Sequence, residues 1–216
     1  MSIAHHPSDE LLWAYAAGAG EPAVSLMVAT HLTYCPRCRA DVSILDALGG
    51  QLLRDLPTAA LNARALETVL ARLDTATVEK TPRAATIRIG NPVPRPLRSF
   101  VGDDLDRVRW RPVAPGLSYR MLMKRGRSRV YLTKSRPGAG IGLHTHRGNE
   151  LTLVLAGGFT DEMGSYGKGD IVLTTPDIHH TPVADDDGDC ITLAMTDAPL
   201  KFRNVGAGLI ARFFGF

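Results

Sequence analysis

The sequence predicts an α+β protein in two parts, an N-terminal bundle of about four short helices followed by a C-terminal all-β barrel. Three observations lead to this prediction. The first part is rich in Ala and Leu with apolar positions at helical spacing. Four prolines follow it, and short β-branched and aromatic segments then alternate with Gly, Pro and Asp. We therefore expect a helical domain at 1–80, a Pro-containing linker at 81–104 and a barrel domain at 105–216.

Composition and charge restrict the class of protein. The chain has 216 residues, of which 44% are hydrophobic and 22% charged, which is typical of a folded globular protein rather than a disordered one. A net charge of +3 is too small to indicate a protein that binds nucleic acid directly. Residues 1–80 carry six basic and nine acidic side chains, which would suit a basic protein partner, although so small an excess is commonly incidental.

Neither a membrane span nor an export signal is evident. The first residues lack a basic stretch followed by an apolar one, and no apolar run approaches the roughly 20 residues that cross a bilayer. Two of the three cysteines lie close together, which suits a reducing compartment where such pairs bind metal or sense redox state. We expect a cytoplasmic protein without membrane contact.

Proline, serine and glycine mark the ends of three helices in the first 50 residues. Pro7 and Ser8 offer a stop and an N-cap before the first helix, and Gly18 and Gly20 follow it. The expected helices cover residues 9–17, residues 22–32 with Pro22 in the first position, and residues from Pro36 to Gly49–Gly50. Because each helix is short, we expect the three to pack together.

A fourth helix is predicted after residue 58. Thr58 is a suitable cap, and the apolar positions that follow form one helical face. These positions are Leu61, Ala65, Leu66, Val69, Leu70 and Leu73. An isolated stripe of this kind more often belongs to the core of a bundle than to a surface for a partner, and both roles remain open at this point.

Three zinc-ligand side chains lie at the junction between the second and third helices, in the pattern His31-x3-Cys35-x2-Cys38. Residues four apart on a helix face the same way, and Pro36 turns the chain so that Cys38 begins the next helix on the same side. The partial positive charge at that helix N-terminus favours thiolates. Three ligands leave one position of a tetrahedral zinc site open.

Two adjacent histidines, His5 and His6, can each supply the fourth ligand. They precede Pro7, so a structural zinc would fasten the N-terminus to the junction between the second and third helices. In the alternative interpretation, Cys35 and Cys38 are ordinary thiols and the histidines are merely polar.

The set of His6, His31, Cys35 and Cys38 resembles the zinc-binding domain of many bacterial anti-sigma factors. The runs His5-His6-Pro7-Ser8-Asp9 and Ala29-Thr30-His31-Leu32 are similar to ChrR-type members in particular. The resemblance implies that these four residues hold zinc. It also implies a 1:1 complex with a sigma factor of the extracytoplasmic-function type, held between three helices and the fourth helix at 58–73.

A second set of ligand-type residues follows in the predicted barrel. Gly138-x5-His144-x-His146-x3-Glu150-x6-Gly157 fits the first cupin motif at every defined position. His144 and His146 are two apart, so on a strand both point to the same face, and Glu150 opens the next strand.

The second cupin motif is weaker and ends in two adjacent histidines. Neighbours on a strand face opposite ways, so we expect only one of His179 and His180 to reach a metal. Resemblance to ChrR-type cupins, which carry H-x-P here, favours His180 with Pro182. Three imidazoles and a carboxylate suit zinc or another divalent transition metal such as iron, manganese or nickel. The alternative is a barrel that has lost its metal.

The resemblance implies an anti-sigma factor that releases its sigma factor on oxidative signals such as singlet oxygen and organic peroxides. We place sensing at the cupin ligands, with Cys190 either beside the pocket or in the plain barrel core. Alternatively, oxidation of Cys35 and Cys38 to a disulfide would eject the zinc. A rival from another class is a metal-dependent cupin enzyme, a dioxygenase or isomerase, with a zinc-stabilised interaction domain.

Overall fold

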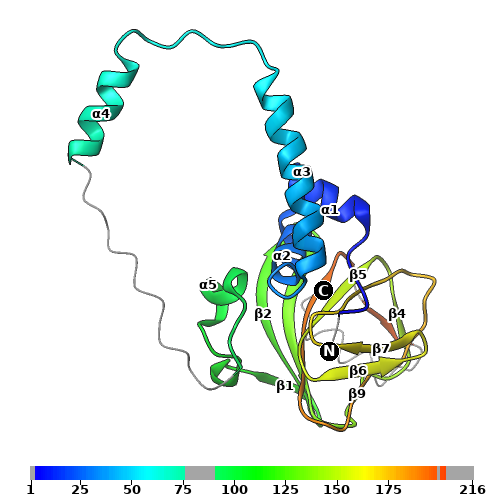
Figure 1. The fold of residues 1–216 in the computed structure, drawn as a ribbon. Helices are drawn as coiled ribbons and strands as arrows, with labels where there is room; N and C mark the ends of the chain where they lie inside the picture. Colours follow the sequence, from blue (N-terminus) through cyan, green and yellow to red (C-terminus); the bar gives the residue numbers. More distant parts are fainter. Residues whose placement is uncertain (1–2, 76–90, 199, 203–216) are drawn as a thin grey trace.

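The predicted α+β class is confirmed by a computed structural model, in which a helical part precedes a β barrel (Figure 1). The structure describes residues 3–75, 91–198 and 200–202. The helices are α1 Asp9–Ala16, α2 Pro22–His31, α3 Pro36–Arg54, α4 Ala65–Thr75 and α5 Arg98–Val101, with single 3-10 turns at Arg95–Leu97 and Leu105–Arg107. Within the described parts of the chain, no helix is both long and apolar enough to cross a membrane.

The barrel is built from antiparallel strands in two facing layers (Figure 1). The larger sheet has the order β1-β2-β3-β10-β5-β8, and the smaller sheets have the orders β7-β6-β9 and β11-β4. The strands are β1 Arg111–Ala114, β2 Leu117–Arg125, β3 Ser128–Ser135, β4 His144–His146, β5 Glu150–Ala156, β6 Gly158–Asp161, β7 Gly164–Gly167, β8 Ile171–Thr174, β9 Val183–Ala184, β10 Cys190–Thr196 and β11 Leu200–Phe202.

The two faces of the large sheet have different surroundings, because strand side chains alternate. On β5, Leu151, Leu153 and Leu155 belong to the main hydrophobic core outside the barrel. Glu150 and Thr152, on the opposite face, line the cavity inside the barrel. One strand thus carries both the packing residues and a candidate metal ligand.

Helix α2 packs against the outer face of the large sheet and touches β3, β5 and β10. Its Ala23 and Met27 are fully buried in the same hydrophobic cluster as Leu153 and Leu193 of the sheet. Val28 of α2 belongs to a second cluster with α1 and α3. The helical part and the barrel therefore share a core that runs through α2.

The expected linker at 81–104 is wrong for the part that the structure describes, while residues 81–90 lie outside the described residues. Pro92 forms a bridge with Asp104, and Val93 and Leu97 are buried in the main core. The prolines fix the backbone of short turns that still present apolar side chains to the core. Residues 91–104 are thus a packed edge of the barrel.

The third and fourth helices differ from their predicted extents. Helix α3 continues through Gly49 and Gly50 to Arg54, since a glycine costs only about 1 kcal/mol within a helix. Helix α4 begins at Ala65 and not after Thr58, because the Asn62 side chain accepts a hydrogen bond from the backbone N–H of Arg64.

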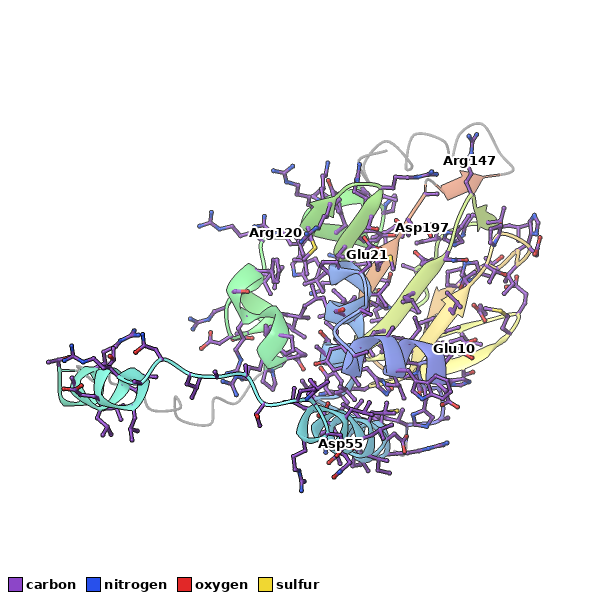
Figure 2. The ribbon with its side chains drawn as sticks, turned by 90° about the horizontal axis from the view of Figure 1, so that it is seen from above. Glu10, Glu21, Asp55, Arg120, Arg147 and Asp197 are labelled. Carbon is purple, nitrogen blue, oxygen red and sulfur yellow. The ribbon has the colours of Figure 1, made fainter. Side chains whose placement is uncertain are left out.

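Helix α4 also stands apart from α1, α2 and α3, so the expected four-helix bundle contains three packed helices (Figure 1). The chain leaves α3 at Asp55 in an extended form that leads to α4, as seen from above in Figure 2. The apolar stripe of α4 is therefore exposed and is not bundle core.

Candidate metal centres

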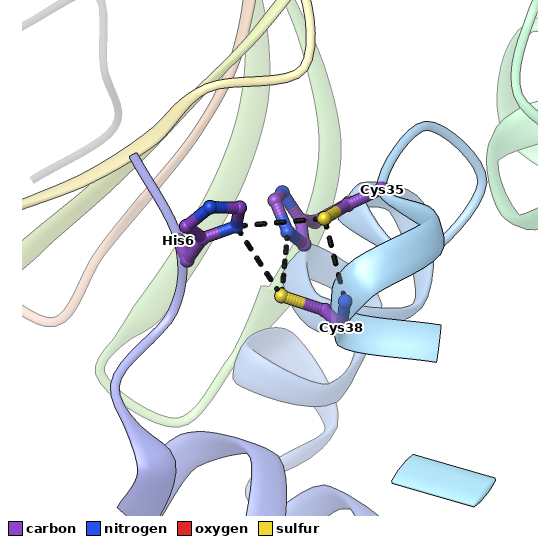
Figure 3. A group of neighbouring side chains, drawn as sticks. His6, Cys35 and Cys38 are labelled. Carbon is purple, nitrogen blue, oxygen red and sulfur yellow. Dashed lines mark hydrogen bonds between the residues drawn. The ribbon is translucent and has the colours of Figure 1, made fainter. Parts of the chain in front are cut away.

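Four side chains from three separate segments meet beside α2. His31 is the last residue of α2, Cys35 is the N-cap of α3, and Cys38 lies in the first turn of α3. His6 comes from the extended segment before α1, and Figure 3 shows its ring turned toward both sulfurs. His6 Nδ1 lies 3.4 Å from each of the two Sγ atoms, and His31 Nε2 lies 3.3 Å from the Cys38 Sγ.

These distances fit a tetrahedral zinc ion. Zinc bonds of 2.0–2.3 Å at tetrahedral angles place a nitrogen and a sulfur ligand about 3.6 Å apart. All four donor atoms lie within 4.8 Å of one another, and His31, Cys35 and Cys38 are buried. The group therefore has the composition and closeness of a closed structural site.

The local sequence explains the position of the two sulfurs. Cys35 adopts an extended conformation, as a residue before proline favours, and Pro36 starts the helix. The backbone N–H of Cys38 donates to the Cys35 Sγ at 3.4 Å. Burial and the neighbouring Cys35 thiol raise the pKa of Cys38 to about 12 in the absence of a cation. A bound cation would offset that cost and favour the thiolate.

The structure separates the roles of His5 and His6. The His5 ring packs against the Tyr166 ring in a tilted arrangement with centroids 4.6 Å apart, and its Nδ1 lies 3.7 Å from an Asp170 oxygen. His5 therefore faces the barrel while His6 faces the sulfurs. His31 donates from Nδ1 to the Gly169 carbonyl at 2.9 Å, which leaves Nε2 to face the cluster.

A second cluster lies inside the barrel. His144 and His146 are on β4, Glu150 begins β5, and His180 forms a backbone bridge with His144. His146 Nε2 lies 3.3 Å from the Glu150 Oε2 and 3.4 Å from the His180 Nε2. All four residues are buried, with donor atoms within 4.8 Å of one another, whereas His179 is exposed.

Burial shifts the pKa values of three residues of this second cluster, His144, His146 and Glu150. Burial and, to a smaller extent, the neighbouring imidazoles lower the pKa of His144 and of His146 to about 4. The same burial raises the pKa of Glu150. The imidazoles of His144 and His146 are consequently neutral at ordinary pH, which is the form that binds a metal ion.

Partners behind the ligands orient them. His180 donates from Nδ1 to the buried Asp161 carboxylate at 2.9 Å, and His144 Nδ1 lies 3.0 Å from the Gly142 carbonyl. Both rings therefore present Nε2 to the centre. The Tyr131 hydroxyl donates to the Glu150 Oε1 at 3.1 Å and leaves the other oxygen toward His146. Hydrogen bonds of this kind fix ligand orientation in metal sites.

A cavity of about 60 Å³ adjoins the second cluster. Apart from the ligands, its lining includes Phe159, Val172, Thr192 and Cys190. The volume has room for a few water-sized molecules. Burial, together with Asp185 and Asp187, raises the pKa of Cys190 to about 12, so this thiol lies at the cavity but is not an activated nucleophile.

The residues behind the ligands were not predicted. Asp161 and Tyr131 lie in strands without a motif, and Gly169 and Asp170 lie outside both sets of predicted ligands. The alternation of β3 does place Tyr131 on the inner face with Thr133, so that residue was within reach of a periodicity argument. The other contacts depend on tertiary structure alone.

Helices that carry a His–Cys cluster, packed on a cupin barrel that carries three histidines and a glutamate, are the arrangement of a cupin-containing anti-sigma factor. The family model described as the ChrR cupin-like domain matches residues 100–199. Anti-sigma-E factor ChrR of Cereibacter sphaeroides is 44% identical over 215 residues, which cover 99% of each chain.

Comparison with solved structures agrees. A chain of the crystal structure of Rhodobacter sphaeroides SigE in complex with the anti-sigma ChrR is 42% identical to this one, with a TM-score of 0.75. The match covers 90% of this chain and 99% of that one. This chain belongs to the ChrR family of anti-sigma factors, whose named members are regulators rather than enzymes.

The adjacent histidines provide a matched test of the N-terminal centre. His6→Ala removes a donor that lies 3.4 Å from both sulfurs and should weaken zinc binding by more than about a hundredfold, beyond the loss typical of an outer partner. His5→Ala should leave zinc binding nearly unchanged. Competition with a chromogenic chelator measures both variants, and equal losses would contradict this assignment.

Acidification should destabilise the metal-free protein. The pKa of about 4 for His144 and His146 lies below the ordinary 6.5, so between these values the unfolded chain takes up protons that the folded chain does not. The free energy of unfolding therefore falls as the pH drops, and the raised pKa of Glu150 offsets a part of this loss. Urea titrations at about pH 7 and about pH 5 measure this fall in the free energy of unfolding. The loss should be smaller in His146→Gln, and an equal loss would refute the explanation.

Proposed function

We propose that this protein binds one sigma factor of the extracytoplasmic-function type through its helices and releases it in the cytoplasm when the barrel responds to an oxidant. The observation that carries this proposal is the pair of exposed apolar stripes on α3 and α4, in a chain whose relative was crystallised with SigE. Binding in a 1:1 complex would lower the free sigma factor by mass action.

The two stripes face solvent although they have the spacing of buried helix faces. On α3, Ile44, Leu48 and Leu52 are 57–68% exposed and lie one helical turn apart. On α4, the exposed apolar residues are Leu66, Val69, Leu70 and Leu73. Contiguous exposed apolar surface of this kind marks a protein interaction site. The extended connection between the helices would allow both stripes to contact one partner.

A metal ion at the N-terminal cluster would stabilise the helix α3 that carries one of the two exposed stripes. A zinc ion at His6, His31, Cys35 and Cys38 would cross-link the N-terminal segment, the end of α2 and the start of α3. The direction of α3, and with it the position of its exposed stripe, would depend on that cross-link. Structural zinc sites of this type contribute folding free energy directly.

Access favours the barrel as the place where the oxidant acts. Cys35 and Cys38 are each 1% exposed, so a dissolved oxidant reaches these thiols poorly. The barrel cluster instead adjoins a cavity that admits small molecules. A metal there would supply an open coordination position, and His144, His146, Glu150 and His180 would hold it. We therefore place the oxidative signal, singlet oxygen or an organic peroxide, at this cluster.

Charges on the α4 stripe should abolish sigma binding. Leu66→Glu combined with Leu70→Glu places two carboxylates in the proposed interface, where apolar anchors contribute about 2 kcal/mol or more each. The affinity should fall at least about a hundredfold. Thr68→Glu, on the opposite face of α4, is the matched control and should bind normally. Co-purification and calorimetry with a sigma factor of the extracytoplasmic-function type measure the effect, and unchanged binding of the double variant would refute the proposed surface.

The histidine pair of the barrel tests the sensing role. His180→Ala should retain sigma binding but lose metal from the barrel and most of the transcriptional response to singlet oxygen or organic peroxide. His179→Ala, which changes an exposed ring, should respond like the unmodified protein. A sigma-dependent reporter assayed with and without oxidant compares them. Normal induction in His180→Ala would exclude sensing at this cluster, and zinc loss from Cys35 and Cys38 alone would favour the thiol switch.

A further inference from the structure

The turn between β7 and β8 contacts the N-terminal metal cluster from two sides. The Gly169 carbonyl accepts the Nδ1–H of His31 at 2.9 Å. The Asp170 Oδ1 accepts the backbone N–H groups of Ala4 at 2.8 Å and His5 at 2.9 Å. Two consecutive barrel residues thus hold one metal-ligand ring and the segment that leads directly to His6.

The Asp170 carboxylate is built into the barrel by its other oxygen. Oδ2 accepts the N–H of Gly167 at 2.8 Å, and the Asp170 N–H donates to the Gly167 carbonyl. The residue is 6% exposed, and the N–H of Ile171 donates to the His5 carbonyl at 3.2 Å. One oxygen closes the turn while the other fastens the N-terminal segment.

Close packing surrounds the same turn. Gly169 has a φ of +94°, and a Cβ there would lie 2.6 Å from the Ile3 Cδ1 and 3.1 Å from the Tyr34 Cβ. Ile3 belongs to the N-terminal segment and Tyr34 to the connection between α2 and α3. The turn therefore sits between the two chain segments that carry His6 and Cys35, at a position where only glycine fits without strain.

We infer that Asp170, together with the Gly169 carbonyl, positions the ligands of the N-terminal metal centre, so that the barrel sets the geometry of that centre. This inference rests on the proposed zinc site. Strand β8 extends the connection, because its Val172 and Thr174 line the barrel cavity and Thr174 pairs with Glu150. The same short strand thus reaches from one candidate metal centre to the other.

Two substitutions break the same hydrogen bond from opposite ends. Asp170→Ala removes the acceptor from the barrel, whereas Ala4→Pro removes a backbone donor from the extended N-terminal segment and leaves the barrel intact. Asp104→Ala is the control, because Asp104 also accepts a backbone N–H but belongs to neither cluster. The full-length protein is loaded with cobalt(II), and chelator-driven loss of thiolate-to-cobalt absorption reports release from the Cys35 and Cys38 site alone.

Cobalt release should be about tenfold faster in Asp170→Ala, the loss typical of an outer partner, and several-fold faster in Ala4→Pro. The double variant should release cobalt no faster than Asp170→Ala, because both changes remove one shared interaction. The inference would be overturned if folded Asp170→Ala released cobalt at the same rate as Asp104→Ala. It would also be overturned if the rate increases of the two single variants multiplied in the double variant. In both cases the zinc site itself would stand. Absence of thiolate-to-cobalt absorption in the unmodified protein would instead remove the zinc site and the inference with it.

Discussion

The packing of α2 against the outer face of the large sheet is the constraint on which the remaining structure depends. Ala23 and Met27 of this helix are buried against the barrel, and Val28 is buried against α1 and α3. A helix that is apolar on all sides must be covered on all sides. Its last residue, His31, is therefore fixed between the sulfurs and the Gly169 carbonyl. Core packing and metal-site geometry are consequences of the same contact.

Sequence patterns predict the parts of the two centres that local geometry determines. The spacing of His144 and His146 predicts that both side chains lie on one face of a strand, and the structure shows them together. The spacing of His31, Cys35 and Cys38 likewise predicts that they meet across a helix junction, as they do. The choice between His5 and His6 could not be made in this way, because it depends on Asp170, 165 residues away in the chain. The packing of residues 91–104 could not be predicted for the same reason. Val93 and Leu97 are buried by tertiary contacts, and a proline-containing sequence gives no sign of that burial.

The two candidate metal centres differ in how easily small molecules reach them, and this difference suits them to different roles. The N-terminal cluster is closed, with both sulfurs buried, both histidines directed inward and the segment before α1 laid across it. Such a site resists exchange and suits a structural ion. The barrel cluster borders a cavity and is backed by Asp161 and Tyr131. Ligands that are rigidly oriented beside open space suit a centre that meets small molecules.

The position of the N-terminal centre at the base of α3 gives small movements a large effect. Cys35 and Cys38 begin this 19-residue helix, whereas its exposed leucines lie in the distal half. A helix of this length extends about 28 Å, so a rotation of about 10° at the base moves the far end by about 5 Å. That displacement is as large as a helical turn and would take an apolar stripe out of register with a partner. The β7–β8 turn contacts His31 at the end of α2 and packs against Tyr34 in the connection that leads into α3, so a movement of the barrel there would act close to the start of α3.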